Sequence, residues 1–168
     1  MSTLDGLWRA GFRGAYRLQL LWWRVRRPRI EGAYVAVWHA GRVLLIRNSY
    51  RRSDSLPAGG LQRGETPTAA ALRELSEEVG IRARAEQLAY RGEIVTTHYA
   101  EDHAHVFELH CEAAPEVRID RREVVWADFI APDEALARPL VPPVRRYLES
   151  RAASTAASKD TPSRNMRR

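Results

Sequence analysis

One stretch of 23 residues, from Gly59 to Ile81, constrains the fold more than any other part of the chain. Thr66 is a good helix N-cap, and Pro67 has the backbone angle that the first helical turn requires. Gly80 supplies the left-handed residue that commonly ends a helix. The sequence therefore predicts a helix of about three to four turns between Thr66 and Gly80.

Acidic side chains crowd one face of this predicted helix. Glu74 and Glu78 are four residues apart and Glu77 follows Glu74 by three, so the carboxylates share a face. Such a cluster repels itself unless a cation lies among the carboxylates, and hard ions such as Mg2+ prefer carboxylate and carbonyl oxygens. Arg73 can brace the cluster, and the glycine turn before the helix brings the carbonyl of Ala58 within reach of a metal. These groups indicate metal-assisted hydrolysis of a phosphoanhydride, whereas the plainer alternative is a solvated, charged surface helix.

Apolar, branched segments alternate with polar turns around this stretch. Strands are predicted at residues 33–38 and 42–47 around a turn at 39–41, at 87–97 and 103–112 around a turn at 100–102, and at 123–129. Short helices are predicted at 132–137 and 143–149. Because strands lie on both sides of the acidic helix in the sequence, we expect a mixed sheet covered by helices.

The two ends of the chain differ in charge from its middle. The net charge is +6, but residues 1–29 contribute +6 and residues 151–168 contribute +4, which leaves −4 for residues 30–150. This distribution gives little support for a nucleic-acid partner. Residues 151–168 contain almost nothing large and apolar and are predicted to form a disordered basic tail. Residues 1–29 predict an amphipathic basic helix with apolar positions at Leu4, Trp8, Ala15, Leu18, Trp22 and Val25.

Two uses are open for the N-terminal helix, which is too charged to cross a membrane. It can pack against the catalytic domain or a second subunit of a homodimer, or it can lie on an anionic membrane surface through Trp22, Trp23 and the arginines of residues 24–29. The single cysteine, Cys111, excludes an internal disulfide and fits a reducing compartment. We therefore expect a cytoplasmic protein, peripheral at the membrane if the second use applies.

The residue pattern from Gly59 to Ile81 resembles the Nudix box. In that box a glycine is followed after five residues by glutamate, and after seven more by Arg-Glu-apolar-any-Glu-Glu-any-Gly-apolar. Such a long pattern is far more specific than a short glycine motif. Every specified position is filled here, by Gly59, Glu65, Arg73, Glu74, Leu75, Glu77, Glu78, Gly80 and Ile81.

This resemblance implies an α/β/α sandwich over residues 30–150 and hydrolysis of a nucleoside diphosphate linked to another moiety, with Mg2+ or Mn2+. No subfamily is identified, because the signatures of NADH pyrophosphatases, coenzyme A hydrolases and ADP-ribose hydrolases are absent. The site residues that the resemblance implies are Ala58, Glu74, Glu77 and Glu78 for the metal, Glu77, Glu78 and Arg73 for catalysis, and Gly59, Glu65 and Gly80 for support.

The general base and the substrate contacts are less firmly encoded. Glu101, Asp102, Asp120 and Glu123 are candidates for the base by position, and Glu123 is favoured because it begins the predicted strand at 123–129. Arg47, Arg51 and Arg52, in and after the second strand, can meet substrate phosphates, whereas the plainer alternative is a solvated loop. Tyr99 stands roughly where dinucleoside polyphosphate hydrolases carry a tyrosine. Further candidates for the substrate cleft are Trp38 and Trp126, which could stack a base, and one or two of His98, His103, His105 and His110.

Two alternatives to a nucleotide hydrolase remain. One is a catalytically silent Nudix module that senses a nucleotide, which the complete acidic set disfavours. The other is a membrane-associated hydrolase of a lipid-linked diphosphate, whose support is the basic, aromatic N-terminal helix.

Overall fold

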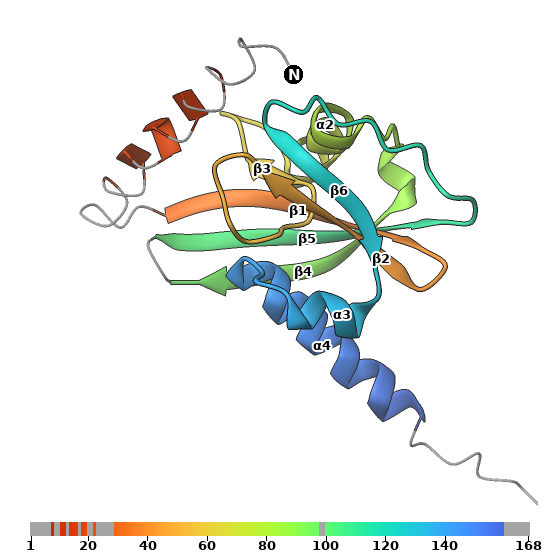
Figure 1. Cartoon of the computed structure of the whole chain (residues 1–168). Coiled ribbons are helices and arrows are strands. Elements are labelled where there is room, and N and C mark those ends of the chain that lie inside the picture. Colours follow the sequence, from red (N-terminus) through yellow and green to blue (C-terminus); the bar gives the residue numbers. More distant parts are fainter. Residues whose placement is uncertain are drawn as a thin grey trace, which may run out of the picture.

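The computed structural model describes residues 29–97 and 100–159, together with individual residues between Trp8 and Trp22. Within this part of the chain, six strands form one mixed sheet with the order β4-β5-β1-β2-β6, and β3 pairs with β1 (Figure 1). β1 and β5 run parallel, and the other pairs are antiparallel. The elements are β1 (Arg29–His39), β2 (Arg42–Asn48), β3 (Ala58–Gly60), α2 (Pro67–Val79), a 3-10 turn (Ala85–Gln87), β4 (Leu88–Thr96), β5 (Glu101–Cys111), β6 (Val124–Ile130), α3 (Pro132–Ala137) and α4 (Pro142–Lys159).

Helices cover both faces of this sheet, with α2 on one side and α3 and α4 on the other (Figure 1). The alternation of side chains along β1 explains the two layers: Ala33, Val35 and Val37 enter the core beneath α2, whereas Ala36 and Trp38 enter the core beneath α4. A strand that is buried on both faces reads as a continuous apolar run, as this one does. The predicted α/β/α sandwich with a mixed sheet is confirmed.

The helix α2 forms as its end signals predict. The side chain of Thr66 accepts a hydrogen bond from the backbone N–H of Ala69 at 3.2 Å, and Pro67 occupies the first helical position. Gly80 ends the helix with φ of 70°, and its N–H bonds to the carbonyl of Leu75. A Cβ added at Gly80 would lie 3.1 Å from the Cβ of Arg118, so both conformation and space favour glycine there.

The long strand β1 changes its partner halfway along one edge. Residues 32–34 pair with β3, whereas residues 38–39 pair with β2, so the chain between β2 and β3 leaves the sheet between these two segments. The chain returns through Ser55, which bonds to Ile46, and through Pro57, whose carbonyl accepts from Val35 at 2.9 Å. The residues 58–60, predicted only as a turn, are therefore a short strand, and this pairing fixes them beside α2.

The N-terminal residues that the structure describes are helical, but the predicted apolar positions among them, Trp8, Ala15, Leu18 and Trp22, are exposed, and Leu4 and Val25 lie outside the described residues. The rings of Phe12 and Tyr16 contact Tyr50 instead, with centroid distances of 6.3 and 4.9 Å. In the described part of the chain, no helix is long and apolar enough to cross a membrane. The predicted apolar positions Trp8, Leu18 and Trp22 are 56%, 71% and 53% exposed.

The C-terminal helix α4 is longer than predicted, because it continues past residue 149 to Lys159. The prediction of a disordered tail from residue 151 is therefore wrong for residues 151–159, and residues 160–168 lie outside the described part. The physical reason is Glu108, a buried carboxylate that accepts a hydrogen bond from Arg151 at 2.5 Å. The Arg151 guanidinium also lies 4.3 Å from the ring centroid of Trp38, so both contacts anchor the added turns.

Candidate active site

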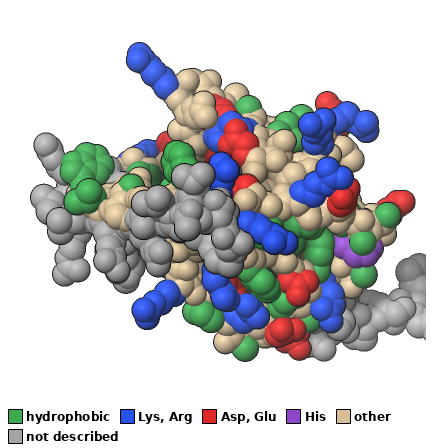
Figure 2. All heavy atoms as spheres, turned by 45° about the horizontal axis from the view of Figure 1, so that its top comes forward, with side chains coloured by type: hydrophobic (Ala, Val, Ile, Leu, Met, Phe, Trp, Pro, Cys, Tyr) green, Lys and Arg blue, Asp and Glu red, His purple; other side chains and the backbone are tan. Residues whose placement is uncertain are grey.

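A cavity of about 1040 Å3 opens where β1 and β2 separate. Its walls come from the start of β1, the loop after β2, β3, α2, and the start of α4. Acidic and basic side chains are interspersed on the face of the molecule in Figure 2. The cavity brings together many residues that are distant in sequence. Of the residues predicted for the site, those that line it are Arg51, Arg52, Ala58, Gly59, Glu74, Glu77, Asp102 and Glu123.

Arg73 is the centre of a network that joins the charged positions of the stretch. Its Nε and Nη2 donate to the two carboxylate oxygens of Glu65, both at 2.9 Å. Its Nη1 donates to Glu74 at 2.5 Å and to Glu77 at 3.3 Å, and Nη2 also reaches the carbonyl of Gly60. Hydrogen bonds from Arg73 and from the N–H of Gln62 lower the pKa of Glu65 to about 2. Arg73 thus has the contacts that its predicted bracing role requires.

The carboxylate of Glu74 lies directly over Gly59. A Cβ added at Gly59 would lie 1.9 Å from one carboxylate oxygen of Glu74 and 2.3 Å from its Cδ, so any side chain at position 59 would displace this carboxylate. Burial raises the pKa of Glu74, and the hydrogen bond and charge of Arg73 oppose that rise. The distance in sequence between Gly59 and Glu74 is therefore a packing requirement, because it places the backbone of a residue without a side chain against the Glu74 carboxylate.

Glu78 is the more deeply buried carboxyl group of the cluster. It accepts hydrogen bonds from the N–H of Ala58 at 2.8 Å and from the side-chain amide of Asn48 at 3.1 Å. Burial is the main cause that raises its pKa to about 8; the two hydrogen bonds lower it, while the charges of Glu74 and Glu123 raise it further. The site thus holds acidic groups whose ionisation is opposed by their surroundings.

The donor set of this cluster fits a hard divalent cation in its chemistry. Carboxylate oxygens are the ligands that such ions prefer, and a nearby cation would relieve the burial and repulsion that raise the pKa values of Glu74 and Glu78. The side chains are not converged on one point: among the described residues, no three His, Cys, Asp or Glu side chains are arranged to hold a metal ion. Glu77 is mostly exposed, with 62% of its side-chain area accessible. The cluster therefore offers the ligands without their final geometry.

Glu123 lies on the cavity wall and is held there by Tyr50, whose hydroxyl donates to it at 3.1 Å. The other acids predicted as bases are engaged differently. Asp120 accepts hydrogen bonds from three successive backbone N–H groups, residues 122–124, which commits it to shaping the turn. Glu101 bonds to His103 at 2.7 Å. Glu123 and Asp102 are thus the two candidates that face the cavity.

The arginines predicted to bind substrate have different surroundings. Arg51 lines the cavity, whereas Arg47 is absent from its lining and donates to the buried Asp54 at 2.7 Å. The guanidinium of Arg47 also lies 5.4 Å from the ring centroid of Trp126. Tyr99 lies outside the described residues, as does His98. Trp38, Trp126 and the described histidines of the second hairpin, His103, His105 and His110, do not line this cavity.

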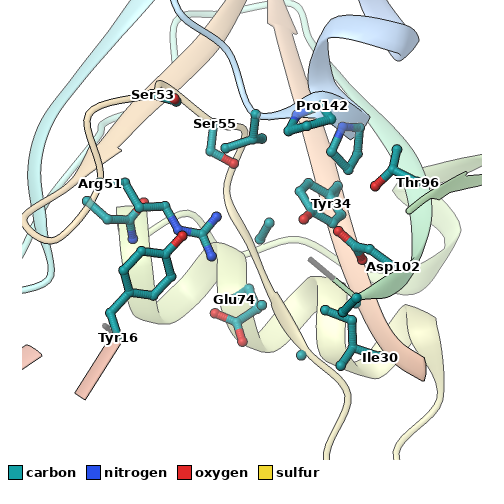
Figure 3. A pocket seen from close by; sticks show the side chains of 18 of the residues that line it. Tyr16, Ile30, Tyr34, Arg51, Ser53, Ser55, Glu74, Thr96, Asp102 and Pro142 are labelled. Carbon is teal, nitrogen blue, oxygen red and sulfur yellow. The ribbon is translucent and has the colours of Figure 1, made fainter. Parts of the chain in front are cut away.

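Three residues that line the cavity, Tyr16, Tyr34 and Thr96, were not found from the sequence. Figure 3 shows Tyr34, Thr96 and Asp102 on one side, Arg51 with Tyr16 on the other, and Glu74 between them. Tyr34 and Asp102 are hydrogen-bonded to each other, and burial raises the pKa of both. No spacing pattern links these residues, because separate strands and the N-terminal segment bring them together.

Comparison with known proteins agrees with this architecture. The model of the NUDIX domain family matches residues 28–150. The MutT protein from Methanosarcina mazei Go1 is 20% identical, with a TM-score of 0.67 over 77% of this chain and 97% of that chain. The Escherichia coli dihydroneopterin triphosphate pyrophosphohydrolase is 20% identical, with a TM-score of 0.62 over 74% and 95% of the two chains. An Ap4A hydrolase from Caenorhabditis elegans is 21% identical, with a TM-score of 0.59 over 75% and 98%. No curated protein matches the sequence.

Proposed function

Because the chain belongs to the Nudix hydrolase family and is an enzyme of the pyrophosphohydrolase type, we propose that it hydrolyses a phosphoanhydride bond in a nucleoside diphosphate linked to another moiety. The observation that carries this proposal is the packing of the Glu74 carboxylate on Gly59, next to the buried carboxyl group of Glu78. A surface helix has no reason to bury two acids around bare backbone, since burial without a cation opposes their ionisation. Burial of two acids is expected, by contrast, in a site that binds a cation, because the cation compensates their charge.

The proposed cofactor is Mg2+ or Mn2+, held by Glu74, Glu77 and Glu78 with the carbonyl of Ala58. When bound, such an ion supplies a Lewis acid for phosphoryl oxygens and lowers the pKa of an attacking water. Arg73 orients the carboxylates through its contacts with Glu74 and Glu77.

In the proposed mechanism, Glu123 accepts the proton of the attacking water. Its Oε1 is occupied by the Tyr50 hydroxyl, so Oε2 is the oxygen that takes the proton. Arg51, which also lines the cavity, binds a phosphate of the substrate, because guanidinium pairs well with phosphate oxygens. The cavity, about 1040 Å3, is at the upper end of the range of about 300–1,000 Å3 for small-molecule sites, so a nucleotide derivative fits.

The test is a substrate panel with Mg2+, Mn2+ or chelator. It contains nucleoside triphosphates, nucleotide sugars, ADP-ribose, NADH, dinucleoside polyphosphates and a prenyl diphosphate, and chromatography separates the products: nucleotides, phosphate esters, phosphate and pyrophosphate. We expect metal-dependent turnover of a nucleotide and its loss in Glu78→Gln. The exposed Glu86, on the 3-10 turn, provides the control Glu86→Gln, which should keep full activity. Turnover that persists in chelator, or that survives in Glu78→Gln, would contradict the proposed metal chemistry.

A further inference from the structure

Arg51 is held in the cavity by aromatic rings. Its guanidinium carbon lies 5.0 Å from the ring centroid of Tyr16 and 5.5 Å from that of Tyr50. Among the described residues, its buried Nε has no hydrogen-bond partner. Cation–ring contacts fix the position of a guanidinium without using its N–H donors. The guanidinium of Arg51 is thus held at the cavity by ring contacts that leave its N–H groups available as hydrogen-bond donors.

One of these two rings comes from outside the family domain. Tyr16 belongs to the N-terminal segment, whereas the NUDIX domain match begins at residue 28. Tyr16 and Gln19 nevertheless line the cavity. The ring of Tyr16 stacks obliquely on Tyr50 at 4.9 Å, and Phe12 adds a second contact to the same ring at 6.3 Å. The N-terminal segment is thereby tied to the cavity wall at Tyr50.

Tyr50 connects this contact to the acidic side of the site, since its hydroxyl donates to Glu123. The charge of Asp102 and the neighbouring Tyr34 also act on Arg51 from across the cavity. The guanidinium therefore lies between the acidic cluster and the opposite polar wall. A phosphate or diphosphate group is the ligand chemistry that a planar cation with free donors recognises in such a position.

We propose that the N-terminal segment is part of the substrate site, with Tyr16 as a positioning residue that holds the Arg51 guanidinium toward a phosphate or diphosphate group of the substrate. This inference rests on the proposed function for the identity of the substrate. It also assigns this segment a role that differs from membrane or subunit contact, because the Tyr16 side chain lies beside Arg51 at the cavity (Figure 3).

The experiment compares full-length variants of the N-terminal segment. Tyr16→Leu keeps apolar bulk and removes the aromatic face, Tyr16→Phe keeps the ring, and Leu18→Ala changes an exposed side chain of the same segment. From the range of cation–ring energies, Tyr16→Leu should raise KM by about 3- to 30-fold, with a much smaller effect on kcat. Tyr16→Phe and Leu18→Ala should stay within about twofold of the wild type. Thermal melting of each variant separates this effect from unfolding.

A double-mutant cycle tests whether Tyr16 acts through Arg51. Arg51→Ala alone should raise KM at least as much as Tyr16→Leu, and adding Tyr16→Leu to Arg51→Ala should have little further effect. Fully additive effects, or a normal KM in folded Tyr16→Leu, would overturn the inference.

Calorimetric binding of ADP to the same variants keeps the inference separate from the proposed function. If the wild type turns over no substrate in the panel but binds ADP, the proposed hydrolysis fails while weaker ADP binding by Tyr16→Leu still supports the positioning role. If the wild type turns over a nucleotide and Tyr16→Leu is normal in both assays, the positioning role alone fails. Absence of both turnover and ADP binding in the wild type would contradict the phosphate ligand.

Discussion

Replacing Glu78 by Gln should change how the stability of the metal-free protein depends on pH. Burial raises the pKa of Glu78 from 4.5 to about 8. Between these two pH values the folded protein holds a proton that the unfolded chain has released, so the free energy of unfolding falls as pH rises. At about 1.4 kcal/mol per pKa unit, the whole difference sets an upper limit of about 5 kcal/mol for this loss. Relaxation of the protein around the buried charge makes this loss smaller, and we expect the free energy of unfolding to fall by about 2–3 kcal/mol.

The assay is urea unfolding in chelator between pH 5 and 8.5. The wild type should lose stability across this window, and Glu78→Gln should show a flatter profile because glutamine has no proton to release. At pH 5 the variant should be slightly less stable, since its amide replaces one acceptor of the hydrogen bonds from Ala58 and Asn48. At pH 8.5 it should be the more stable protein.

The control is Glu77→Gln, which removes the same formal charge from an exposed position of the same helix. It should follow the wild-type profile within about 0.5 kcal/mol. Added Mg2+ at pH 8 should stabilise the wild type and have much less effect on Glu78→Gln, since the ion binds only the folded state. A wild-type stability that does not change between pH 5 and 8 in chelator would refute the argument that ionisation of the buried Glu78 destabilises the metal-free fold.

Three further substitutions test other parts of the site and fold. Gly59→Ala should displace the Glu74 carboxylate and lower kcat/KM by about 10- to 100-fold, whereas Gly60→Ala, whose added Cβ would meet no atom closer than 3.8 Å, should be nearly normal in the same kinetic assay. Glu123→Gln should lower kcat by about 100-fold or more while calorimetry gives an unchanged Mg2+ affinity; a normal rate across pH would remove this residue as the base. Asp54→Asn should lower the free energy of unfolding by about 2–4 kcal/mol, because its fully buried carboxylate bridges two arginines, and a loss below about 0.5 kcal/mol in urea unfolding would contradict that role.

The helix α2 and its charged positions could be predicted from the sequence because their signals are local. The cap at Thr66, the proline after it and Gly80 each act within one helical turn. The contact of Arg73 with Glu77, four residues later, also follows from spacing on a helix. The sheet followed from apolar strands on both sides of that helix, because each strand is identified by its own composition.

The difference between Arg47 and Arg51 could not be predicted, because it depends on partners that arrive from elsewhere. Arg47 and Arg138 both donate hydrogen bonds to Asp54, and Arg138 is 84 residues away from Asp54 in the chain. Arg51 is instead held by a ring from the N-terminal segment. The same limit explains the missed Asn48, whose amide meets Glu78 only because β2 ends beside α2. The end of α4 was missed for the same reason. The segment has few apolar residues, and it is fixed instead by the hydrogen bond of Arg151 to the buried Glu108, which the sequence does not indicate.

The sequence pattern identifies the acidic residues of the site but not their ionisation, and the contrast between Glu65 and Glu78 shows why. Both are glutamates at specified positions of one motif, yet the pKa is about 2 for Glu65 and about 8 for Glu78. Glu65 faces a guanidinium and a backbone N–H, whereas Glu78 is buried beside other acids and receives hydrogen bonds from neutral groups. A single motif thus contains two kinds of carboxyl group. Glu65 is already ion-paired with Arg73, whereas Glu78 has no cationic partner among the described residues. We therefore expect the binding of a divalent cation to release protons from the Glu78 side of the cluster, so its affinity should increase with pH while the Arg73–Glu65 pair stays intact.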